Sequence, residues 1–477
     1  MTDQNKSTDL DVFFHSRSVA VFGASTNPNK SGYKLVQNLI DHNYKGKIYP
    51  INPKGGEILG RKLYTSLTEV EGSVELAILY IPSSKAIQVL KDCIQKGVKG
   101  AIIEAAGFGE VGEEGKKLKE QIIALTENFT KIRVLGPNCT GITFVEKDGE
   151  GFFSSFIPMG KTKAGSLAIV SQSGFINGAY YPDFTSRNPN LGVRYVITIG
   201  NKMDLDENDI LEYLIHDKDL STIGMYIESF RDVRRFIKLC NEAYKNYGKR
   251  IVLLRSGLSS IGSNATTSHT GALAEKSELI KAVIAQSHCI QADDFWDLFN
   301  ITRTLSFMKD TNIKPIYDAS ACVVTISGAA GAIMADWSEK YGVKIPLLDD
   351  ETYSNLAKLY PPWMAPNKYA LIDYWPAVEN AKGDYQRILL DCIDIGLSSP
   401  RINAAFVAAY HNATAWKVDW NLLKEIMARH QKPIFIWLFG EYHELIEAEK
   451  IFQEIKIPIY HSEREIVQTF KKIVQLK

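Results

Sequence analysis

The sequence predicts a doubly wound α/β protein, and three observations support this fold class. Short runs of β-branched and aliphatic residues alternate with amphipathic stretches from residue 12 to residue 145, and the same rhythm returns twice further along the chain. Alternation of strand and helix favours parallel strands with helices on both faces of the sheet. The length of 477 residues allows two to four domains, each with its own core.

The first region shows both kinds of element at regular spacing. The predicted strands are Ser18–Phe22, Lys47–Ile51, Leu76–Ile81, Gly100–Glu104 and Ile132–Leu135. Helical periodicity covers Gly32–His42, Ser84–Lys96 and Glu113–Asn128. Residues 146–165 lose this rhythm and are rich in Gly, Ser and Phe. We therefore expect a boundary there and a first domain at 1–148.

Two further α/β regions follow. The second has predicted strands at Ser166–Val170, Val193–Thr198, Thr222–Ile227 and Arg250–Leu254, and predicted helices at Glu207–His216, Arg231–Tyr247, Ala272–Gln286 and Asp294–Met308. Residues 309–318 resemble a linker, and the third region has predicted strands at Ala321–Ile326, Ala404–Ala409 and Pro433–Leu438. We expect domains at 160–308 and 318–477. Both open with a strand that leads through Ser-Gly into a helix, at Ser173-Gly174 and at Ser327-Gly328.

The composition excludes several classes of function. Lys and Arg together number 55, as do Asp and Glu, so charge gives no reason to expect nucleic acid or an acidic membrane as a partner. The absence of a long apolar run predicts a cytoplasmic protein without a membrane span. The six cysteines form no CxxC pair, and the nine histidines show no HxxxH spacing. We therefore expect neither a disulfide framework nor a metal site.

The loop after the first predicted strand suits a phosphate group. It runs from Gly23 to Gly32 and contains Ser25 and Lys30, but it is not the GxGxxG fingerprint of a dinucleotide site. Asn52-Pro53 occupies the strand end where a dinucleotide site has its acidic ribose anchor. A hydroxyl, an ammonium and backbone amides together could hold a phosphate or pyrophosphate. An NAD site and a purely structural glycine-rich turn are the alternatives.

The segment Ser268-His269-Thr270-Gly271 precedes a predicted helix. Unpaired amides at a helix N-terminus bind phosphate, and an imidazole beside them can carry a phosphoryl group covalently. The alternative is a capping Ser or Thr beside an incidental histidine. The turn Ser171-Gln172-Ser173-Gly174 offers a second helix start. Glu228, at the end of a predicted strand, could hydrogen-bond the His269 ring, or it could be a surface charge.

The fifth predicted strand ends in Gly136-Pro137-Asn138-Cys139. A lone cysteine is usually part of the core, and no histidine near Cys139 in the sequence would activate it as a nucleophile. Asn138 is the better candidate for a ligand contact at this strand end.

These residues carry a resemblance that covers the whole chain. The sequence resembles the α-subunit of the nucleoside-diphosphate-forming (ADP-forming) acyl-CoA synthetases, in the succinyl-CoA synthetase superfamily. Each matching segment alone is weak or moderate, but all occur in the order found in the family. The segments are Val21-Phe22-Gly23-Ala24-Ser25, Ala105-Ala106-Gly107-Phe108-Gly109-Glu110-Val111-Gly112, Gly136-Pro137-Asn138-Cys139, Ser171-Gln172-Ser173-Gly174, Gly200-Asn201-Lys202, Ile227-Glu228 and Ser268-His269-Thr270-Gly271.

The resemblance implies a Rossmann-like CoA-binding domain followed by two flavodoxin-like domains. It implies that His269 is the phosphorylated residue, that Glu228 orients it, and that two helix starts bind the phosphate. The phosphate-binding residues would be Ser171, Gln172, Ser173, Gly174, Thr270 and Gly271. The residues near CoA would be Gly23, Ser25, Lys30, Pro53, Lys54, Pro82, Ser83 and Asn138.

The resemblance also implies a partner, because an ATP-grasp unit phosphorylates the histidine in this family and nothing in this chain looks like one. We expect a separate β-subunit that supplies ATP and Mg²⁺, and an α₂β₂ heterotetramer. The implied cycle phosphorylates His269, passes the phosphoryl group to a small carboxylic acid, and lets the CoA thiol attack the acyl phosphate. Each step is reversible. The rival hypothesis is a non-catalytic CoA-binding or regulatory protein on the same fold.

The sequence departs from the family pattern in four places. Thr140 replaces the usual aliphatic residue, and Glu275 replaces a frequent glycine. Residues 257–262 lack the Arg and Glu common before the histidine, and residues 371–375 (Leu-Ile-Asp-Tyr-Trp) stand near the place of the usual Asn-Pro-apolar-Asp. The last change bears on the acid that is accepted or on subunit contacts. An aromatic cluster of Trp363, Tyr374 and Trp375 could widen a pocket, or it could be core or interface packing.

Overall fold

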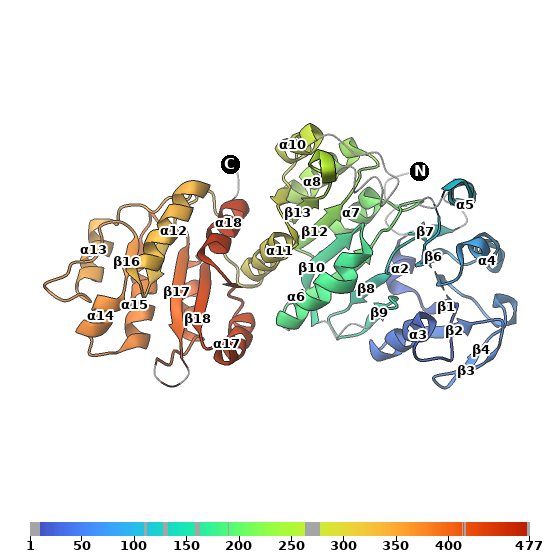
Figure 1. The fold of residues 1–477 in the computed structure, drawn as a ribbon, viewed down its shortest axis with the longest axis horizontal. Coiled ribbons are helices and arrows are strands. Elements are labelled where there is room, and N and C mark those ends of the chain that lie inside the picture. Colours follow the sequence, from blue (N-terminus) through green and yellow to red (C-terminus); the bar gives the residue numbers. More distant parts are fainter. Residues whose placement is uncertain are drawn as a thin grey trace. The chain divides into compact units, whose positions relative to one another are not determined.

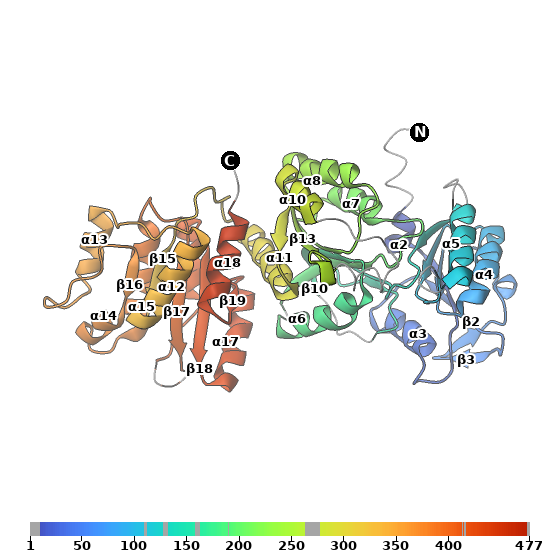
Figure 2. The same cartoon turned by 45° about the horizontal axis from the view of Figure 1, so that its top comes forward.

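The computed structural model describes residues 10–108, 112–126, 132–157, 163–188, 190–262, 277–412, 414 and 416–474. The chain forms two compact units, one of residues 1–187 with 191–298 and the other of residues 188–190 with 299–477. Each contains twisted sheets flanked by helices (Figures 1 and 2). No helix among the described residues is both long enough and apolar enough to cross a bilayer.

The first sheet has five parallel strands in the order β2-β1-β5-β6-β7. The strands are β1 (Ser18–Phe22), β2 (Lys47–Ile51), β5 (Leu76–Leu79), β6 (Gly100–Ile103) and β7 (Arg133–Leu135). The helices of this region are α2 (Asp11–His15), α3 (Ser31–Asp41), α4 (Ser83–Lys96) and α5 (Gly112–Thr126). Every residue of β1, β5 and β6 is buried, as expected for parallel strands covered on both faces.

The second sheet has seven strands in the order β14-β13-β12-β10-β11-β8-β9. Its parallel strands are β10 (Lys163–Ser171), β11 (Gly192–Thr198), β12 (Thr222–Ile227), β13 (Arg250–Arg255) and β14 (Ile290–Ala292). The hairpin of β8 (Ile142–Val145) and β9 (Gly151–Phe153) adds an antiparallel edge. The helical elements are η2 (Ile176–Tyr180), α6 (Tyr181–Arg187), α7 (Glu207–Ile215), α8 (Val233–Tyr247), α10 (Ser277–Gln286) and the first part of α11 (Phe295–Asp310).

One hydrophobic core joins the first two sheets, which explains why they form a single unit. Phe14 of α2 stacks against Tyr213 of α7 and meets the ring of Tyr195 of β11 edge-on. Leu35 and Val36 of α3 belong to the same buried cluster. The opposite face of the first sheet, under α4 and α5, has a core of its own. Burial of these apolar side chains is what fixes the two sheets against each other.

The second unit contains a parallel sheet in the order β16-β15-β17-β18-β19. The strands are β15 (Cys322–Thr325), β16 (Leu371–Asp373), β17 (Ala405–His411), β18 (Ile434–Gly440) and β19 (Ile459–Tyr460). The helices are α12 (Gly328–Tyr341), α13 (Asp350–Ala357), α14 (Trp375–Asn380), α15 (Tyr385–Ser398), α16 (Leu422–His430), α17 (Tyr442–Glu454) and α18 (Glu463–Ile473). In order of appearance the strands run 2-1-3-4-5, the flavodoxin-like arrangement.

The predicted α/β class with parallel sheets is confirmed. The sequence analysis missed the β8–β9 hairpin and the small hairpin of β3 (Gly56–Ile58) and β4 (Arg61–Leu63). These strands have three or four residues and no helix between them, so they lack the βα rhythm used for the prediction. Tyr374, one of the three clustered aromatic residues, lies in the core of the second unit, whereas Trp363 is 74% exposed.

Candidate active site

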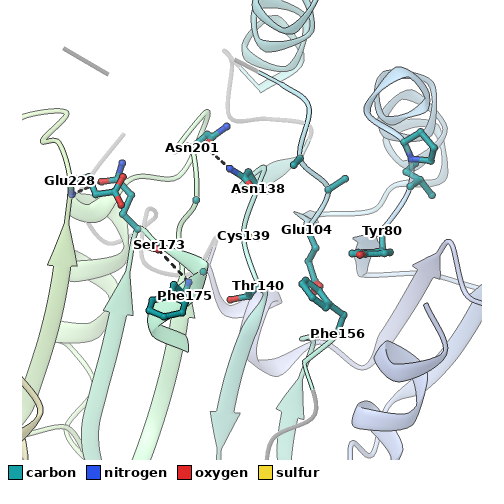
Figure 3. A pocket seen from close by; sticks show the side chains of 17 residues that line it. Tyr80, Glu104, Asn138, Cys139, Thr140, Phe156, Ser173, Phe175, Asn201 and Glu228 are labelled. Carbon is teal, nitrogen blue, oxygen red and sulfur yellow. Dashed lines mark hydrogen bonds between the residues drawn. The ribbon is translucent and has the colours of Figure 1, made fainter. Parts of the chain in front are cut away.

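A cavity of about 570 Å³ lies where the carboxyl ends of the first two sheets meet (Figure 3). The carboxyl ends of strands are where open α/β sheets bind ligands. From the first sheet come Tyr80, Ile81, Pro82, Glu104, Ala105, Ala106, Asn138, Cys139 and Thr140. Phe156, Gln172, Ser173, Gly174, Phe175, Gly200, Asn201 and Glu228 complete the wall. The cavity therefore connects the two predicted ligand regions within one compact unit.

The loop after β7 is held against the loop after β11 by backbone hydrogen bonds. The amide of Asn201 donates to Pro137 O at 2.9 Å, and the amide of Met203 donates to Gly136 O at 3.1 Å. The Asn138 side chain adds a bond from Nδ2 to Asn201 Oδ1, at 3.4 Å. A Cβ on Gly200 would lie 2.2 Å from Pro137 O, so only glycine allows this approach. These contacts explain why Gly200-Asn201 and Gly136-Pro137-Asn138 occur together in the sequence.

A buried ion pair also holds β7 against the segment that follows β11. Arg133 of β7 donates from Nε to Asp204 Oδ2 at 3.0 Å, and the two side chains are only 9% and 3% exposed. Asp204 Oδ2 also accepts from the backbone amide of Val134 at 2.7 Å. Burial raises the pKa of the Asp204 carboxyl, while Arg133 and the Val134 amide oppose that shift. Loss of Arg133 would leave the buried Asp204 carboxylate without its cationic partner.

The turn after β10 is closed by its own hydroxyl group. Ser171 Oγ donates to Ser173 O at 2.6 Å and accepts from the Ser173 amide at 3.1 Å. The helix begins at Gly174 and passes through a π-helical turn at Ile176–Tyr180. A Cβ on Gly174 would lie 2.7 Å from Thr140 Cγ2, so the helix start packs tightly on the loop after β7. Gln172, Ser173 and Gly174 of this turn line the cavity, and a helix start favours an anion.

Thr140 links this turn to the sheet. Its hydroxyl lies 2.8 Å from the Thr198 hydroxyl of β11, which in turn accepts from Asn177 Nδ2. An aliphatic residue could not make this bond. The departure from the family pattern at residue 140 therefore adds a hydroxyl that takes part in a hydrogen-bond network with Thr198 and Asn177.

Glu228 stands at the end of β12 and is held by the turn after β10. Gln172 Oε1 accepts from the backbone amides of Glu228 and Ser229, at 2.9 and 3.2 Å. Glu228 Oε1 accepts from the Tyr226 hydroxyl at 3.2 Å. Burial and the neighbouring Glu228 carboxylate raise the pKa of Tyr226 to about 12, so the phenol stays a donor at neutral pH. Gln172 Oε1 thus positions the backbone of Glu228.

Glu104 and Cys139 lie side by side deeper in the cavity wall. Cys139 Sγ donates to Ile103 O at 3.3 Å, and burial together with Glu104 raises the pKa of the thiol well above its usual range. A buried, protonated thiol is a poor nucleophile, which agrees with the expectation from the sequence. Burial likewise raises the pKa of Glu104 well above its usual range, and the Phe156 backbone amide offsets only part of that shift.

The loop after β1 is shaped by two glycines. Gly23 has a φ of +87°, and a Cβ there would lie 2.1 Å from Tyr80 O. A Cβ on Gly32 would lie 1.9 Å from Gly23 O. Asn52 Nδ2 donates to Ala24 O at 2.7 Å, which ties the end of β2 to this loop. Ser25, Lys30, Pro53 and Lys54 therefore all lie at the carboxyl edge of the first sheet, and Lys30 directly precedes α3.

The structure brings some of the predicted site residues together and leaves others apart. Those that line the cavity are Pro82, Asn138, Gln172, Ser173, Gly174 and Glu228. Ser171 is fully buried behind the turn. Gly23, Ser25, Lys30, Pro53, Lys54 and Ser83 are not among the residues that line this cavity. His269, Thr270, Gly271 and the departure at Glu275 fall in residues 263–276, outside the described residues.

Tyr80, Glu104 and Phe156 are among the cavity residues that the sequence analysis did not single out. Glu104 had a usable signal, because a carboxylate directly after the apolar run of β6 is unusual in a parallel strand buried on both faces. Tyr80 directly follows β5 in the same way. Phe156 had no such signal, since it lies after the unpredicted β8–β9 hairpin.

Two domain descriptions match the first unit and define its class. "CoA binding domain" matches residues 17–144, and "Succinyl-CoA ligase like flavodoxin domain" matches residues 164–305. The first match favours CoA over the dinucleotide alternative for the loop after β1. The fold and the cavity thus define a CoA-binding α/β ligase subunit.

Relatives and a solved structure extend the similarity to nearly the whole chain. Acetate–CoA ligase [ADP-forming] II subunit alpha of Pyrococcus furiosus is 34% identical over 473 residues, which are 98% of this chain and 97% of that protein. Acetate–CoA ligase [ADP-forming] II of Archaeoglobus fulgidus is 29% identical over 476 residues, 98% of this chain but 67% of that protein. The chain belongs to the α-subunits of the nucleoside-diphosphate-forming acyl-CoA synthetases, in the succinyl-CoA synthetase superfamily.

The solved structure supports the fold of both units. The dinucleotide forming acetyl-coenzyme A synthetase 1 of Ca. Korarchaeum cryptofilum, in complex with phosphate and ADP, matches with a TM-score of 0.81 and 26% identity. The match covers 97% of this chain and 96% of that chain.

Proposed function

We propose that this chain is the CoA-binding, phosphoryl-carrying α-subunit of an ADP-forming acyl-CoA synthetase. It would convert a small carboxylic acid, CoA and ATP into acyl-CoA, ADP and phosphate, reversibly, through a phosphohistidine at His269 and an acyl phosphate. The observation that carries this proposal is the cavity that joins the CoA-binding region to the Ser171–Gly174 turn and Glu228. One thiol can therefore reach the place where a phosphoryl group would be held.

The phosphate end of the cavity supports the phosphohistidine. β13 pairs with β12 so that Arg255 lies opposite Ile227, and the chain that leads to His269 leaves the sheet beside Glu228. A carboxylate that accepts from one ring nitrogen leaves the other as the nucleophile. The amides after Ser171, with Gln172, Ser173 and Gly174, would share the phosphate with Thr270 and Gly271. A protein that only binds CoA has no need of this arrangement.

The other end of the cavity supports CoA binding. Pro82 and Asn138 line the cavity, and the remaining predicted CoA residues lie at strand ends or helix starts of the same sheet: Gly23, Ser25, Lys30, Pro53, Lys54 and Ser83. We infer that the nucleotide part of CoA lies over the loop after β1. The pantetheine arm would then run past Pro82 into the cavity.

ATP and Mg²⁺ would enter through a separate β-subunit with an ATP-grasp fold, in an α₂β₂ complex. The Pyrococcus furiosus relative is named as an alpha subunit, and the Archaeoglobus fulgidus relative extends beyond the part that matches this chain. The additional sequence in that relative supports the proposal that the ATP-binding function is supplied to this chain by a second chain.

Mass spectrometry of the chain, co-expressed with its β-subunit and incubated with ATP and Mg²⁺, tests the proposal. We expect one phosphate on His269, removed when CoA and an accepted acid from a panel are added. His269→Ala should abolish phosphorylation and leave CoA binding unchanged, whereas Glu228→Gln should slow phosphorylation. His216→Ala, on the exposed end of α7, is the matched control, since another histidine is removed there. CoA binding without phosphorylation of the wild-type complex would favour the non-catalytic alternative.

A further inference from the structure

Glu104 is a buried carboxyl group for which the packing gives no structural reason. It directly follows β6 and is 5% exposed. Neither carboxyl oxygen makes a hydrogen bond of normal geometry among the described residues, and the nearby Phe156 backbone amide lowers the pKa only in part. Burying such a group without a partner costs free energy, so it is rarely retained where an apolar side chain would pack as well. It lies in the cavity wall, where a ligand can supply the missing partner.

The surroundings leave little freedom to the Glu104 side chain. A Cβ on Gly141, whose φ is +77°, would lie 2.8 Å from Glu104 Oε1. The rings of Tyr80 and Phe156, 5.2 Å apart, line the same part of the cavity, and Figure 3 shows Glu104 between Cys139 and this aromatic pair. Glycine at residue 141 therefore makes room for a carboxyl group that neighbouring side chains hold in place.

The position of Glu104 fits the sulfur end of CoA. The cavity runs from Pro82, on the CoA-binding side, to Ser173 and Glu228, on the phosphate side, and Glu104 lies on its first-sheet wall. A thiol that attacks an acyl phosphate must lose its proton within this space. A proton acceptor already in the wall, shielded from bulk water, would serve that step.

The other titratable side chains that line the cavity are Tyr80, Cys139 and Glu228. The Cys139 thiol already donates to Ile103 O, and its raised pKa makes it a donor rather than an acceptor. Glu228 accepts from Tyr226 and stands beside the phosphate-binding turn, where the proposed function assigns it to His269. The phenol hydroxyl of Tyr80 is a weaker proton acceptor than a carboxylate.

We propose that Glu104 accepts the proton of the CoA thiol as the sulfur attacks the acyl phosphate, and returns it to the sulfur in the reverse direction. This inference rests on the proposed function of the same cavity. In the forward step the S–C bond forms, the bond from the acyl carbon to the phosphate oxygen breaks, and phosphate leaves with the electron pair. The thiol proton moves to a Glu104 carboxylate oxygen and passes from there to phosphate or water.

The electrostatics of the cavity agree with this role. Burial raises the pKa of Glu104, so the carboxylate, once ionised, is a stronger base toward a thiol than an exposed carboxylate would be. A carboxylate with an ordinary pKa near 4.3 would be a much weaker base toward a thiol.

The thiol step can be measured separately from phosphorylation. The α/β complex is given acetyl phosphate and CoA without ATP, and formation of acetyl-CoA is followed from pH 5 to pH 9. Glu104→Gln keeps the size and polarity of the side chain but cannot accept the proton. We expect it to lower kcat about 100-fold or more, as general-base removal does, with the KM for CoA unchanged. The limb of the pH profile that reports the base should disappear, and Glu104→Asp should recover part of the rate.

Two controls make the outcome decisive. Glu114→Gln changes an exposed glutamate on α5 and should match the wild type. Phosphorylation of His269 by ATP does not involve the thiol and should be unaffected in Glu104→Gln. A Glu104→Gln complex with the wild-type rate and pH profile would overturn the proposal, and so would equal loss of thioester formation and phosphorylation. If the wild-type complex forms no acyl-CoA from the acyl phosphate of any acid in the panel, the proposed function fails instead.

Discussion

The turn after β10 and the turn after β15 have the same internal hydrogen bonds but different neighbours. In the first, Ser171 Oγ bonds the carbonyl and amide of Ser173, and in the second, Thr325 Oγ1 bonds the carbonyl and amide of Ser327, both at 3.1 Å. Both lead into a helix that begins with glycine. A hydroxyl residue at the strand end, three positions before the first helical residue, is therefore sufficient for the local shape.

The neighbouring strands give these two turns different surroundings. At the second turn, the Asp373 carboxyl at the end of β16 faces the start of α12, 3.3 Å from the position of a Cβ on Gly328, and the Gly328 and Trp375 amides both lower its pKa against the larger effect of burial. At the first turn, Gln172 ties Glu228 to the turn through its backbone, and the helix start lines a cavity. The same local motif thus faces a carboxyl group in one unit and lines a cavity in the other.

The largest expected effect comes from making the first turn resemble the second. Gln172 corresponds in the turn to Ile326, whose side chain has no hydrogen-bond acceptor. Gln172→Ile should leave the amides of Glu228 and Ser229 without their acceptor and slow phosphorylation of His269 about 100-fold, because a displaced catalytic group loses its alignment. Single-turnover phosphorylation by ATP in the α/β complex measures this effect. As a control, Gln88→Ile at an exposed position on α4 should leave the rate unchanged. An unchanged rate in Gln172→Ile would show that Gln172 is not needed to position Glu228.

The next largest effect is on stability, and it should differ between the first glycines of the two helices, Gly174 and Gly328. Gly174→Ala should cost about 1–3 kcal/mol of unfolding free energy, because its Cβ would overlap Thr140 Cγ2 at 2.7 Å. Gly328→Ala should cost less, since its nearest neighbour is Asp373 Oδ2 at 3.3 Å. Chemical denaturation measures both variants. Adding Thr140→Ser to Gly174→Ala removes the methyl group but keeps the hydroxyl and should restore most of the stability; no restoration would show that the cost lies elsewhere.

The proton on the buried Glu104 carboxyl should make the stability of the protein depend on pH. Burial raises the pKa of native Glu104, so the native state holds this proton more tightly than the unfolded chain. As pH rises from about 4.3 to the native pKa, the wild type should lose about 1.4 kcal/mol per pH unit relative to Glu104→Gln. Thermal unfolding at pH 4 and pH 8 tests this direction. The Tm of Glu104→Gln relative to that of the wild type should be higher at pH 8 than at pH 4. A Tm difference independent of pH would contradict a proton held on Glu104.

The smallest expected effect concerns the capped turn. Ser327 makes no side-chain cap of α12, so Asp373 takes that role from the neighbouring strand. Asp373→Ala should cost about 1 kcal/mol of stability, as the loss of other N-caps does. Asp336→Ala, on the exposed face of the same helix, should stay within about 0.5 kcal/mol of the wild type. Equal Tm values for the two variants would show that Asp373 does not cap α12.

The sequence by itself determined many of the parallel strands and the residues that follow them, but not the short strands of the β3–β4 and β8–β9 hairpins. The predicted bounds of Ser18–Phe22, Lys47–Ile51 and Thr222–Ile227 agree with β1, β2 and β12, because apolar periodicity and strand-end residues are local properties. The position of Glu228 after a buried strand could be predicted for the same reason.

The tertiary structure alone decided which of these strand ends share a cavity. Strand order, the β8–β9 hairpin and the core between the first two sheets bring Glu104, Asn138 and Glu228 to one cavity, although 124 residues separate Glu104 from Glu228 in the sequence. The isolation of the Glu104 carboxyl and the capping of α12 by Asp373 depend on neighbours distant in sequence. Burial and hydrogen bonding between such groups are set by packing, and no local pattern encodes them.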